Sequence, residues 1–212
     1  MKSSREKILD TAERLFAERS YDAVSVRDIT NAADVRVASI NYYFNSKQGL
    51  YHEILERRAN IIIREREKRL SNIPFSTLSN ENAIYEICKV IIAPIFEKVV
   101  TNEPGWRAYV GVVASFVSRE IQPGRDRSTL NALDKVSKEL IASLQKYSVH
   151  PTDKQAHIAF QLITGSALYA MVDNGRINKL SEGEYRTDDY QSLFDCTLEF
   201  IAAGVIKLLT TK

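Results

Sequence analysis

The segment RVASINYYFNSK, from Arg36 to Lys47, places small, amide and phenolic side chains between two cations and contains no acidic residue. Amide and methyl groups recognise the edges of DNA bases, while phenolic hydroxyls and lysines contact phosphates. A protein core disfavours adjacent polar groups, and a solvated helix face disfavours adjacent aromatic rings. This composition therefore predicts a surface that docks on a polyanion, with double-stranded DNA as the first candidate.

Histidine and cysteine, which often carry catalysis or hold metals, are few and scattered in the sequence. The three histidines (His52, His150 and His157) and two cysteines (Cys88 and Cys196) do not have the spacing of metal ligands. The sequence contains no phosphate-cradling glycine loop and no nucleophile-elbow motif. We therefore expect no catalytic residue, no metal site and no cofactor, and we interpret both cysteines as reduced core residues.

Helices must position the opening segment. The chain has only eight glycines and five prolines, and apolar residues recur at helical spacing almost everywhere. Ser3 with Glu6 forms a capping-box pattern for a first helix that ends near residues 19–20. Ser25 with Asp28 forms a second such pattern, which begins a shorter helix.

A tight turn at Asp34 and Val35 leads into a third helix over about 37–44, since Asp tolerates the turn geometry. Ser46 begins a fourth helix that runs to about residue 72. Further helices are predicted over about 82–101, 104–121, 127–147, 152–175 and 187–210. The predicted fold is all-α, with a small N-terminal helical unit joined by the long fourth helix to a C-terminal bundle.

The second and third helices have the length of a helix-turn-helix, whose second helix enters the DNA major groove. Ile40 and Phe44 are spaced to anchor that helix, which leaves its leading side chains exposed. Asn41 is a candidate partner for adenine, and Val37 for a thymine methyl group. The predicted DNA-binding residues are Ser25, Arg27, Arg36, Val37, Ala38, Ser39, Asn41, Tyr42, Tyr43 and Lys47.

The order SVRDITNAADVRVASINYYFNSKQGLYHEIL resembles the DNA-binding signature of the TetR family of transcriptional repressors, over about residues 4–57. The resemblance implies a homodimer that binds a palindromic operator and is released by a small-molecule inducer. It also implies a helix-turn-helix domain over residues 1–57 and a ligand-binding and dimerisation domain over 58–212.

Four positions depart from the family pattern. Asp34 stands where the turn usually has glycine, and Arg36 stands where a serine usually caps the third helix. Asn41 stands where tyrosine is commonest, so the base preference should differ from that of relatives. Gly49 stands where an acid is usual, which should loosen the start of the fourth helix.

The resemblance also implies functional sites in the C-terminal bundle. The candidates for an inducer pocket in the middle helices are Phe96, Trp106, Arg107, Tyr109, Val113, Phe116, Arg119 and Glu120. The candidates for the dimer interface in the last two long helices are Phe160, Ile163, Thr164, Ala167, Leu168, Met171, Phe194, Thr197, Leu198 and Ile201. Ordinary core packing is the alternative for each of these side chains.

Composition separates the rival functions. The formal net charge is +2, which disfavours a nonspecific architectural DNA binder. A helical adaptor that binds only proteins would leave the segment 36–47 unexplained. A transcriptional activator would use the same residues as a repressor, so this alternative stays open. No apolar run is long enough to cross a membrane, and the charged N-terminus does not fit a secretory signal, so we expect a cytoplasmic protein.

Overall fold

The computed structural model of the 212-residue chain describes residues 3–19, 21–117, 128–150, 152, 154–172, 175–185 and 189–211. These residues form helices and no strand, which confirms the predicted all-α class. The chain divides into two compact units. The first comprises Met1–Ile61 and Asn102–Thr129, and the second comprises Ile62–Thr101 and Leu130–Lys212.

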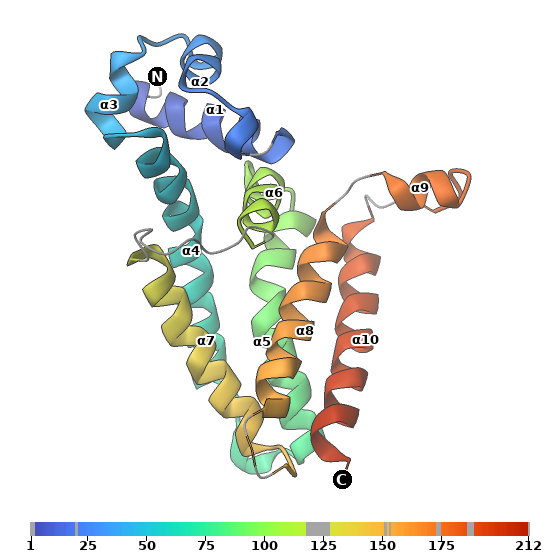
Figure 1. Cartoon of the computed structure of the whole chain (residues 1–212). Helices are drawn as coiled ribbons and strands as arrows, with labels where there is room; N and C mark the ends of the chain where they lie inside the picture. Colours follow the sequence, from blue (N-terminus) through green and yellow to red (C-terminus); the bar gives the residue numbers. More distant parts are fainter. Residues whose placement is uncertain are drawn as a thin grey trace. The chain divides into compact units, whose positions relative to one another are not determined.

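The first unit contains three short helices, the first part of a long one and one later helix (Figure 1). They are α1 (Ser4–Glu18), α2 (Val26–Ala33), α3 (Ala38–Phe44), α4 (Lys47–Ser71) and α6 (Trp106–Val117), with a 3-10 turn, η1, at Tyr21–Ala23. Both predicted capping boxes are present. The Ser3 hydroxyl accepts from the Glu6 amide at 3.2 Å, and the Ser25 hydroxyl accepts from the Asp28 amide at 3.1 Å.

Helix α6 belongs to the first unit, although the sequence pattern placed residues 104–121 among the helices of the C-terminal bundle. It packs against α1. Gly111 permits this approach, because a Cβ atom there would lie 3.1 Å from the Cβ atom of Ala17. The Tyr51 hydroxyl donates to the Val112 carbonyl at 3.3 Å and joins α4 to the same helix.

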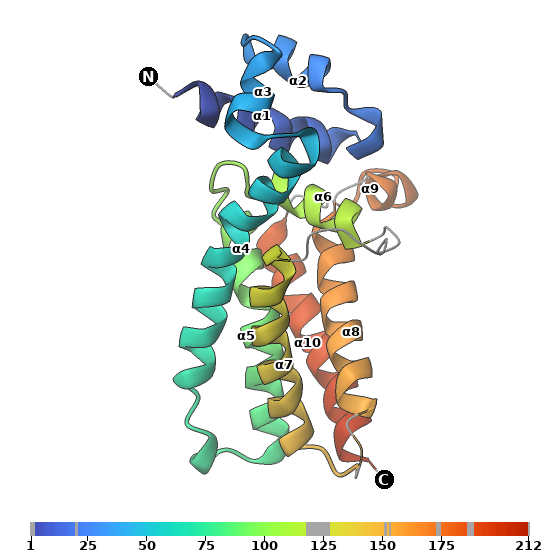
Figure 2. The same ribbon diagram turned by 60° about the vertical axis from the view of Figure 1, so that its left-hand side comes forward.

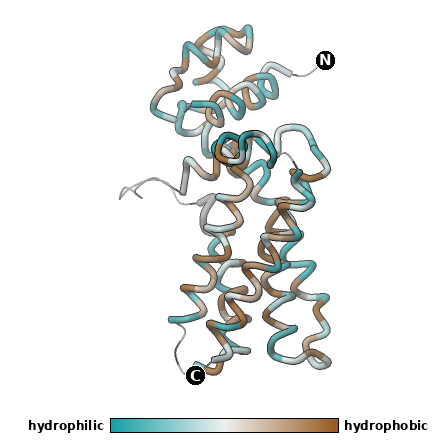
Figure 3. Tube along the Cα trace, turned by 90° about the vertical axis from the view of Figure 1, so that its right-hand side faces the viewer, coloured by the Kyte–Doolittle hydropathy of each residue, from teal (hydrophilic) through white to brown (hydrophobic). Residues whose placement is uncertain are grey.

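The second unit is a helical bundle (Figure 2), and hydrophobic and hydrophilic residues alternate along its helices (Figure 3). Its buried residues are mostly aliphatic. Its helices besides the end of α4 are α5 (Asn80–Val100), α7 (Ser128–Lys146), α8 (Lys154–Met171), α9 (Arg176–Leu180) and α10 (Tyr190–Thr210), with the turn η2 at Phe75–Thr77. Within this unit α5 packs against α8 and α10. The long helices were all predicted, whereas α9 and both short turns were not, because single turns leave little periodicity to detect.

Two arginines of α4 join it to α5 inside the second unit. Arg66 donates to the Ile91 carbonyl from Nε at 3.1 Å and from Nη2 at 2.6 Å. Ile91 lies one turn before Pro94, which lacks an amide hydrogen and so interrupts the helical hydrogen bonding. Arg69 donates two hydrogen bonds to Glu97, at 2.8 and 2.6 Å, and this pairing lowers the pKa of the Glu97 carboxyl group.

The first turn of helix α4 contains a glycine, Gly49, that the neighbouring backbone requires. The Ser46 hydroxyl caps the helix by accepting from the Gly49 amide at 3.0 Å. A Cβ atom at position 49 would overlap the Phe44 carbonyl oxygen. The glycine therefore allows α3 to end close to the first turn of α4. From the sequence, Gly49 was expected only to loosen the start of this helix.

We expect Gly49→Ala to lower the free energy of unfolding by about 1–3 kcal/mol, because the added methyl group forces the two helices apart. Alanine in a helix interior ordinarily stabilises by about 0.5–1 kcal/mol relative to glycine, so the sign is diagnostic. Urea unfolding followed by circular dichroism measures it. Gln48→Ala, at the exposed neighbouring position, serves as the control. A Gly49→Ala protein more stable than wild type would contradict the geometry.

Candidate DNA-binding surface

The turn between α2 and α3 is fixed by backbone hydrogen bonds. Asp34, the residue expected to form the turn, adopts a left-handed conformation, with φ 53° and ψ 55°. Its amide donates to the Asn31 carbonyl at 3.3 Å, and the Val35 amide donates to the Thr30 carbonyl at 3.0 Å. These bonds satisfy carbonyl groups at the end of α2 and set the direction in which α3 leaves the turn.

Helix α3 is held to the first unit by one face. Ile40 and Phe44 are buried, as their spacing predicted. The helix packs against both α1 and α2, and the guanidinium group of Arg5 lies 5.5 Å from the centre of the Phe44 ring. Because the two anchors are four residues apart, they fix the rotation of α3 about its axis.

The opposite face of α3 is open to solvent. Val37 is 51% exposed and Tyr42 is 80% exposed. Ala38, Asn41 and Tyr43 are also exposed, whereas Ser39 is half-buried. The rings of Tyr42 and Tyr43 meet edge to face, with their centres 4.8 Å apart. The structure therefore leaves Val37, Ala38 and Asn41, which are predicted to contact bases, accessible to solvent.

The predicted cations divide into two kinds. Arg27 and Arg36 are exposed and form no ion pair with any residue that the structure describes. Lys47 is half-buried: its ammonium group donates to the Tyr21 carbonyl and lies 4.0 Å from the centre of the Tyr21 ring. Two arginines are thus available to phosphates, while the lysine contacts its own domain.

Ser25 is also engaged inside the domain. Its amide and hydroxyl groups both donate to the Asp28 carboxylate, at 2.8 Å in each case. These hydrogen bonds favour the ionised carboxylate and hold the pKa of Asp28 below its ordinary value. Arg19 lies 3.7 Å from the same carboxylate. The start of α2 is therefore a compact polar cluster rather than a free set of phosphate ligands.

The residues predicted to line an inducer pocket are divided between the two units. Phe96 is buried in the second unit, where its ring lies 5.4 Å from that of Phe194. Trp106 and Tyr109 are buried in the first unit with ring centres 5.6 Å apart. On the same helix, Arg107 is exposed and Val113 is half-buried. Three predictions lie outside the described side chains or residues: Phe116, Arg119 and Glu120.

Most residues predicted for a dimer interface lie in the core of the second unit. Six of them are buried: Ile163, Ala167, Met171, Thr197, Leu198 and Ile201. The other four are half-buried: Phe160, Thr164, Leu168 and Phe194. Because α8 and α10 pack on each other and on α5, these stripes face neighbouring helices of the same chain.

A different apolar face of α8 and α10 is exposed, and sequence reasoning missed it. Leu162, Tyr169 and Phe200 are 55%, 68% and 76% exposed. They line a shallow groove together with Gly165 and Cys196. The signal was present in the sequence: Ile158, Leu162 and Tyr169, spaced by four and seven residues, form a second apolar stripe on α8.

Within the described part of the chain, His, Cys, Asp and Glu side chains do not cluster in groups of three or more that could hold a metal ion. Among the described helices, none has the length and apolar character needed to cross a membrane.

Two family profiles match the chain. Residues 8–54 match the bacterial regulatory proteins of the tetR family, and residues 89–204 match the tetracyclin repressor-like C-terminal domain. The second match alone covers more than half of the chain. The chain belongs to the TetR family. Membership of this family of bacterial regulatory proteins agrees with the sequence-based prediction of a transcriptional regulator and not an enzyme.

Curated relatives of this TetR-family chain are also regulators. The probable HTH-type transcriptional regulator YttP of Bacillus subtilis (strain 168) is 35% identical over 92 residues, which are 38% of this chain and 44% of YttP. IcaR of Staphylococcus epidermidis, the negative transcriptional regulator of the biofilm operon icaADBC, is 32% identical over 59 residues, 28% of this chain and 32% of IcaR. The chain thus spans less than half the length of each relative.

Solved structures share the TetR fold. The ketosteroid regulator KstR2 of Mycobacterium tuberculosis has a TM-score of 0.65 at 16% identity, covering 96% of this chain and 95% of KstR2. AibR, solved with isovaleryl coenzyme A and operator DNA, has a TM-score of 0.59 at 17% identity, covering 98% of each chain. At these identities the likeness establishes the fold alone.

The internal contacts of Lys47 lead to a stability prediction. Lys47→Ala removes the hydrogen bond to the Tyr21 carbonyl and the cation–π contact, and we expect the free energy of unfolding to fall by about 1 kcal/mol. Tyr42→Ala removes an exposed ring and should leave stability within about 0.5 kcal/mol of wild type. Urea unfolding of the three proteins measures both effects. Equal stability of Lys47→Ala and wild type would show that the lysine is not held in this way.

Proposed function

We propose that this TetR-family regulator is a repressor that binds a palindromic operator as a homodimer and is released by a small-molecule inducer. The observation that carries the proposal is the division of α3 into a buried face, with Ile40 and Phe44, and an exposed face, with Asn41 and Tyr42. A helix anchored in this way presents a fixed set of side chains to the DNA major groove.

Each exposed side chain has a proposed contact. Asn41 pairs with an adenine edge, and the methyl groups of Val37 and Ala38 meet thymine methyl groups. Tyr42 and Tyr43 donate their hydroxyls to phosphates. Further members of the proposed surface are Ser25, Arg27, Arg36, Ser39 and Lys47. Of these, Ser25 and Lys47 act mainly by shaping the domain, since both are engaged within it.

Dimerisation is proposed through the exposed apolar face of α8 and α10. Leu162, Tyr169 and Phe200 are each more than half exposed, and large exposed apolar groups that adjoin one another mark interaction surfaces. A twofold dimer uses the same patch on both copies, so one such face is sufficient. The buried stripes of α8 and α10 then support this face from within each protomer.

Regulation by a ligand is proposed for the region from residue 58 onward, which we assign to ligand binding and dimerisation. Phe96, which is buried in the second unit, remains a candidate apolar contact. An inducer acts only if it binds the DNA-incompetent conformation more tightly than the competent one. Because AibR was solved with isovaleryl coenzyme A, acyl-CoA thioesters are the first compounds to screen.

Repression rather than activation is supported by the name of IcaR as a negative regulator. Because the operator DNA lies in the cytoplasm, we also propose a cytoplasmic location for the protein. Selection of bound duplexes from a random pool identifies the operator, and in vitro transcription from a promoter carrying it separates the two outcomes. Reduced transcription supports repression, whereas increased transcription would make the protein an activator.

We expect Asn41→Ala to lose its preference for one base at a symmetric position in each half-site, a discrimination of about 1–3 kcal/mol. Arg27→Ala and Arg36→Ala should instead weaken binding to all duplexes. Each should reduce the slope of log affinity against log salt by about 2 per dimer, one phosphate contact for each protomer. Fluorescence anisotropy with the selected duplex and its single-base variants measures both effects. Unchanged base preference in Asn41→Ala would contradict the docking of α3.

The dimer face yields a separate prediction. Phe200→Glu places a charge on the proposed interface and should convert the dimer to a folded monomer, because burying an unpaired carboxylate is unfavourable. Tyr185→Glu, at an exposed aromatic outside the α8–α10 groove, should leave the dimer intact. Sedimentation equilibrium distinguishes the species. A wild-type monomer, or a dimeric Phe200→Glu protein, would contradict this interface.

A further inference from the structure

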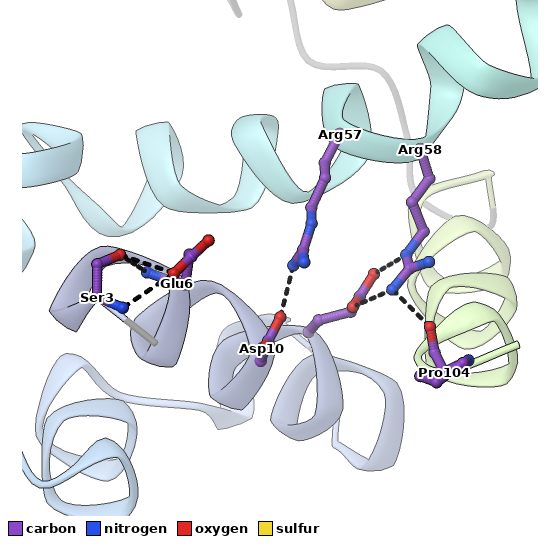
Figure 4. A network of polar contacts seen from close by, with 7 residues as sticks. Ser3, Glu6, Asp10, Arg57, Arg58 and Pro104 are labelled. Atoms are coloured by element: carbon purple, nitrogen blue, oxygen red, sulfur yellow. Dashed lines mark hydrogen bonds and ion pairs between the residues drawn. The ribbon is translucent and has the colours of Figure 1, made fainter. Parts of the chain in front are cut away.

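The first unit contains a buried ion pair between α1 and α4 (Figure 4). Arg58 donates to the Glu13 carboxylate from Nε at 2.6 Å and from Nη2 at 3.0 Å. The two side chains are 10% and 3% exposed. Removing both charges from water is costly, and well-packed apolar residues often stabilise such a position equally well. The pair therefore calls for a role besides stability.

The same guanidinium group also holds the segment that leads into α6. Its Nη2 atom donates to the Pro104 carbonyl at 3.1 Å, and its centre lies 4.9 Å from the centre of the Trp106 ring. Gly105 has a φ of +80°, and a Cβ atom there would overlap Nη2 and lie 2.9 Å from the Glu13 carboxylate. The backbone at 104–106 is thus fitted closely around the ion pair.

These contacts lie next to two places where the chain passes between the compact units. Arg58 is three residues before Ile61, the last residue of the first unit on α4. Pro104 is two residues after Asn102, where the chain returns to that unit. Glu13 lies on α1, the helix against which both α3 and α6 pack. The contacts of Glu13, Arg58 and Pro104 therefore connect both of these chain segments to α1, the helix that supports α3.

We propose that Glu13 and Arg58 are positioning residues that make α6 and the part of α4 in the first unit move as one body with α1, so that DNA binding and α6 are energetically coupled. The proposal rests on DNA binding by α3, proposed above. Coupling of this kind needs a shared element that both sites bias. Without the pair, α1 and α4 still contact each other, but the segment 104–106 loses its hydrogen bond to α4.

The test is hydrogen–deuterium exchange measured with and without the selected operator duplex. In wild type, we expect the duplex to slow exchange in α3, which it covers, and also at least ~3-fold in α6, which it does not contact. Glu13→Gln should keep the protection of α3 and lose that of α6. Because the single variant leaves an unpaired charge, the double variant Glu13→Leu with Arg58→Met tests the same point with both charges removed.

The chain offers a matched control in the neighbouring pair of Asp10 and Arg57. This pair joins the same two helices at 2.6 Å, but both side chains are about one-third exposed, and the Pro104 carbonyl accepts from Arg58 rather than from Arg57 (Figure 4). Asp10→Asn should therefore retain protection of both α3 and α6. This comparison separates coupling from the mere loss of a charge between α1 and α4.

The outcomes distinguish the two proposals. If the duplex protects α3 in every protein but α6 in none, or protects α6 equally in wild type and in the double variant, the coupling role is wrong and DNA binding stands. If the duplex fails to protect α3 in wild type, the proposed DNA-binding function itself fails. Loss of α6 protection in Asp10→Asn as well would overturn the specific assignment to Glu13 and Arg58.

Discussion

The burial of Ile40 and Phe44 against the first unit is the constraint on which the rest of the site depends. Two apolar anchors one turn apart remove the freedom of α3 to rotate about its axis. The residues between them, Asn41, Tyr42 and Tyr43, must then face solvent, and all three are exposed. The left-handed turn at Asp34 and the glycine at position 49 both serve this one placement, because the turn leads into α3 and the glycine lets α3 end close to α4.

The polar groups around α3 show how a small domain uses charge in two ways. Lys47 contacts the carbonyl and ring of Tyr21, and the Asp28 carboxylate accepts from Ser25, so these charges stabilise the local fold. Arg27 and Arg36 remain exposed without a described ion-pair partner. A net charge of +2 is therefore compatible with DNA binding, because the available cations flank the one helix that is proposed to enter the groove.

Sequence alone predicted the helices and the face of α3 because both depend on local patterns: capping pairs such as Ser3 with Glu6, and apolar residues at helical spacing. Properties set by distant contacts could not be predicted in this way. The place of α6 in the first unit depends on Gly111 lying against Ala17, and the ion pair joins residues 13 and 58. On α8, two apolar stripes are present, and only the packing of α5 shows which is core and which, with Leu162 and Tyr169, is exposed.

In the proposed complex, the α3 helices of the two protomers enter the major groove at two adjacent half-sites. Chemical interference on the selected operator tests this docking most directly. Methylation of guanine N7, in the major groove, should block binding at two symmetric positions about 10 base pairs apart or a multiple of this. Methylation of adenine N3, in the minor groove, should have little effect at those positions. Interference confined to the minor groove, or interference at a single unpaired site, would contradict the account.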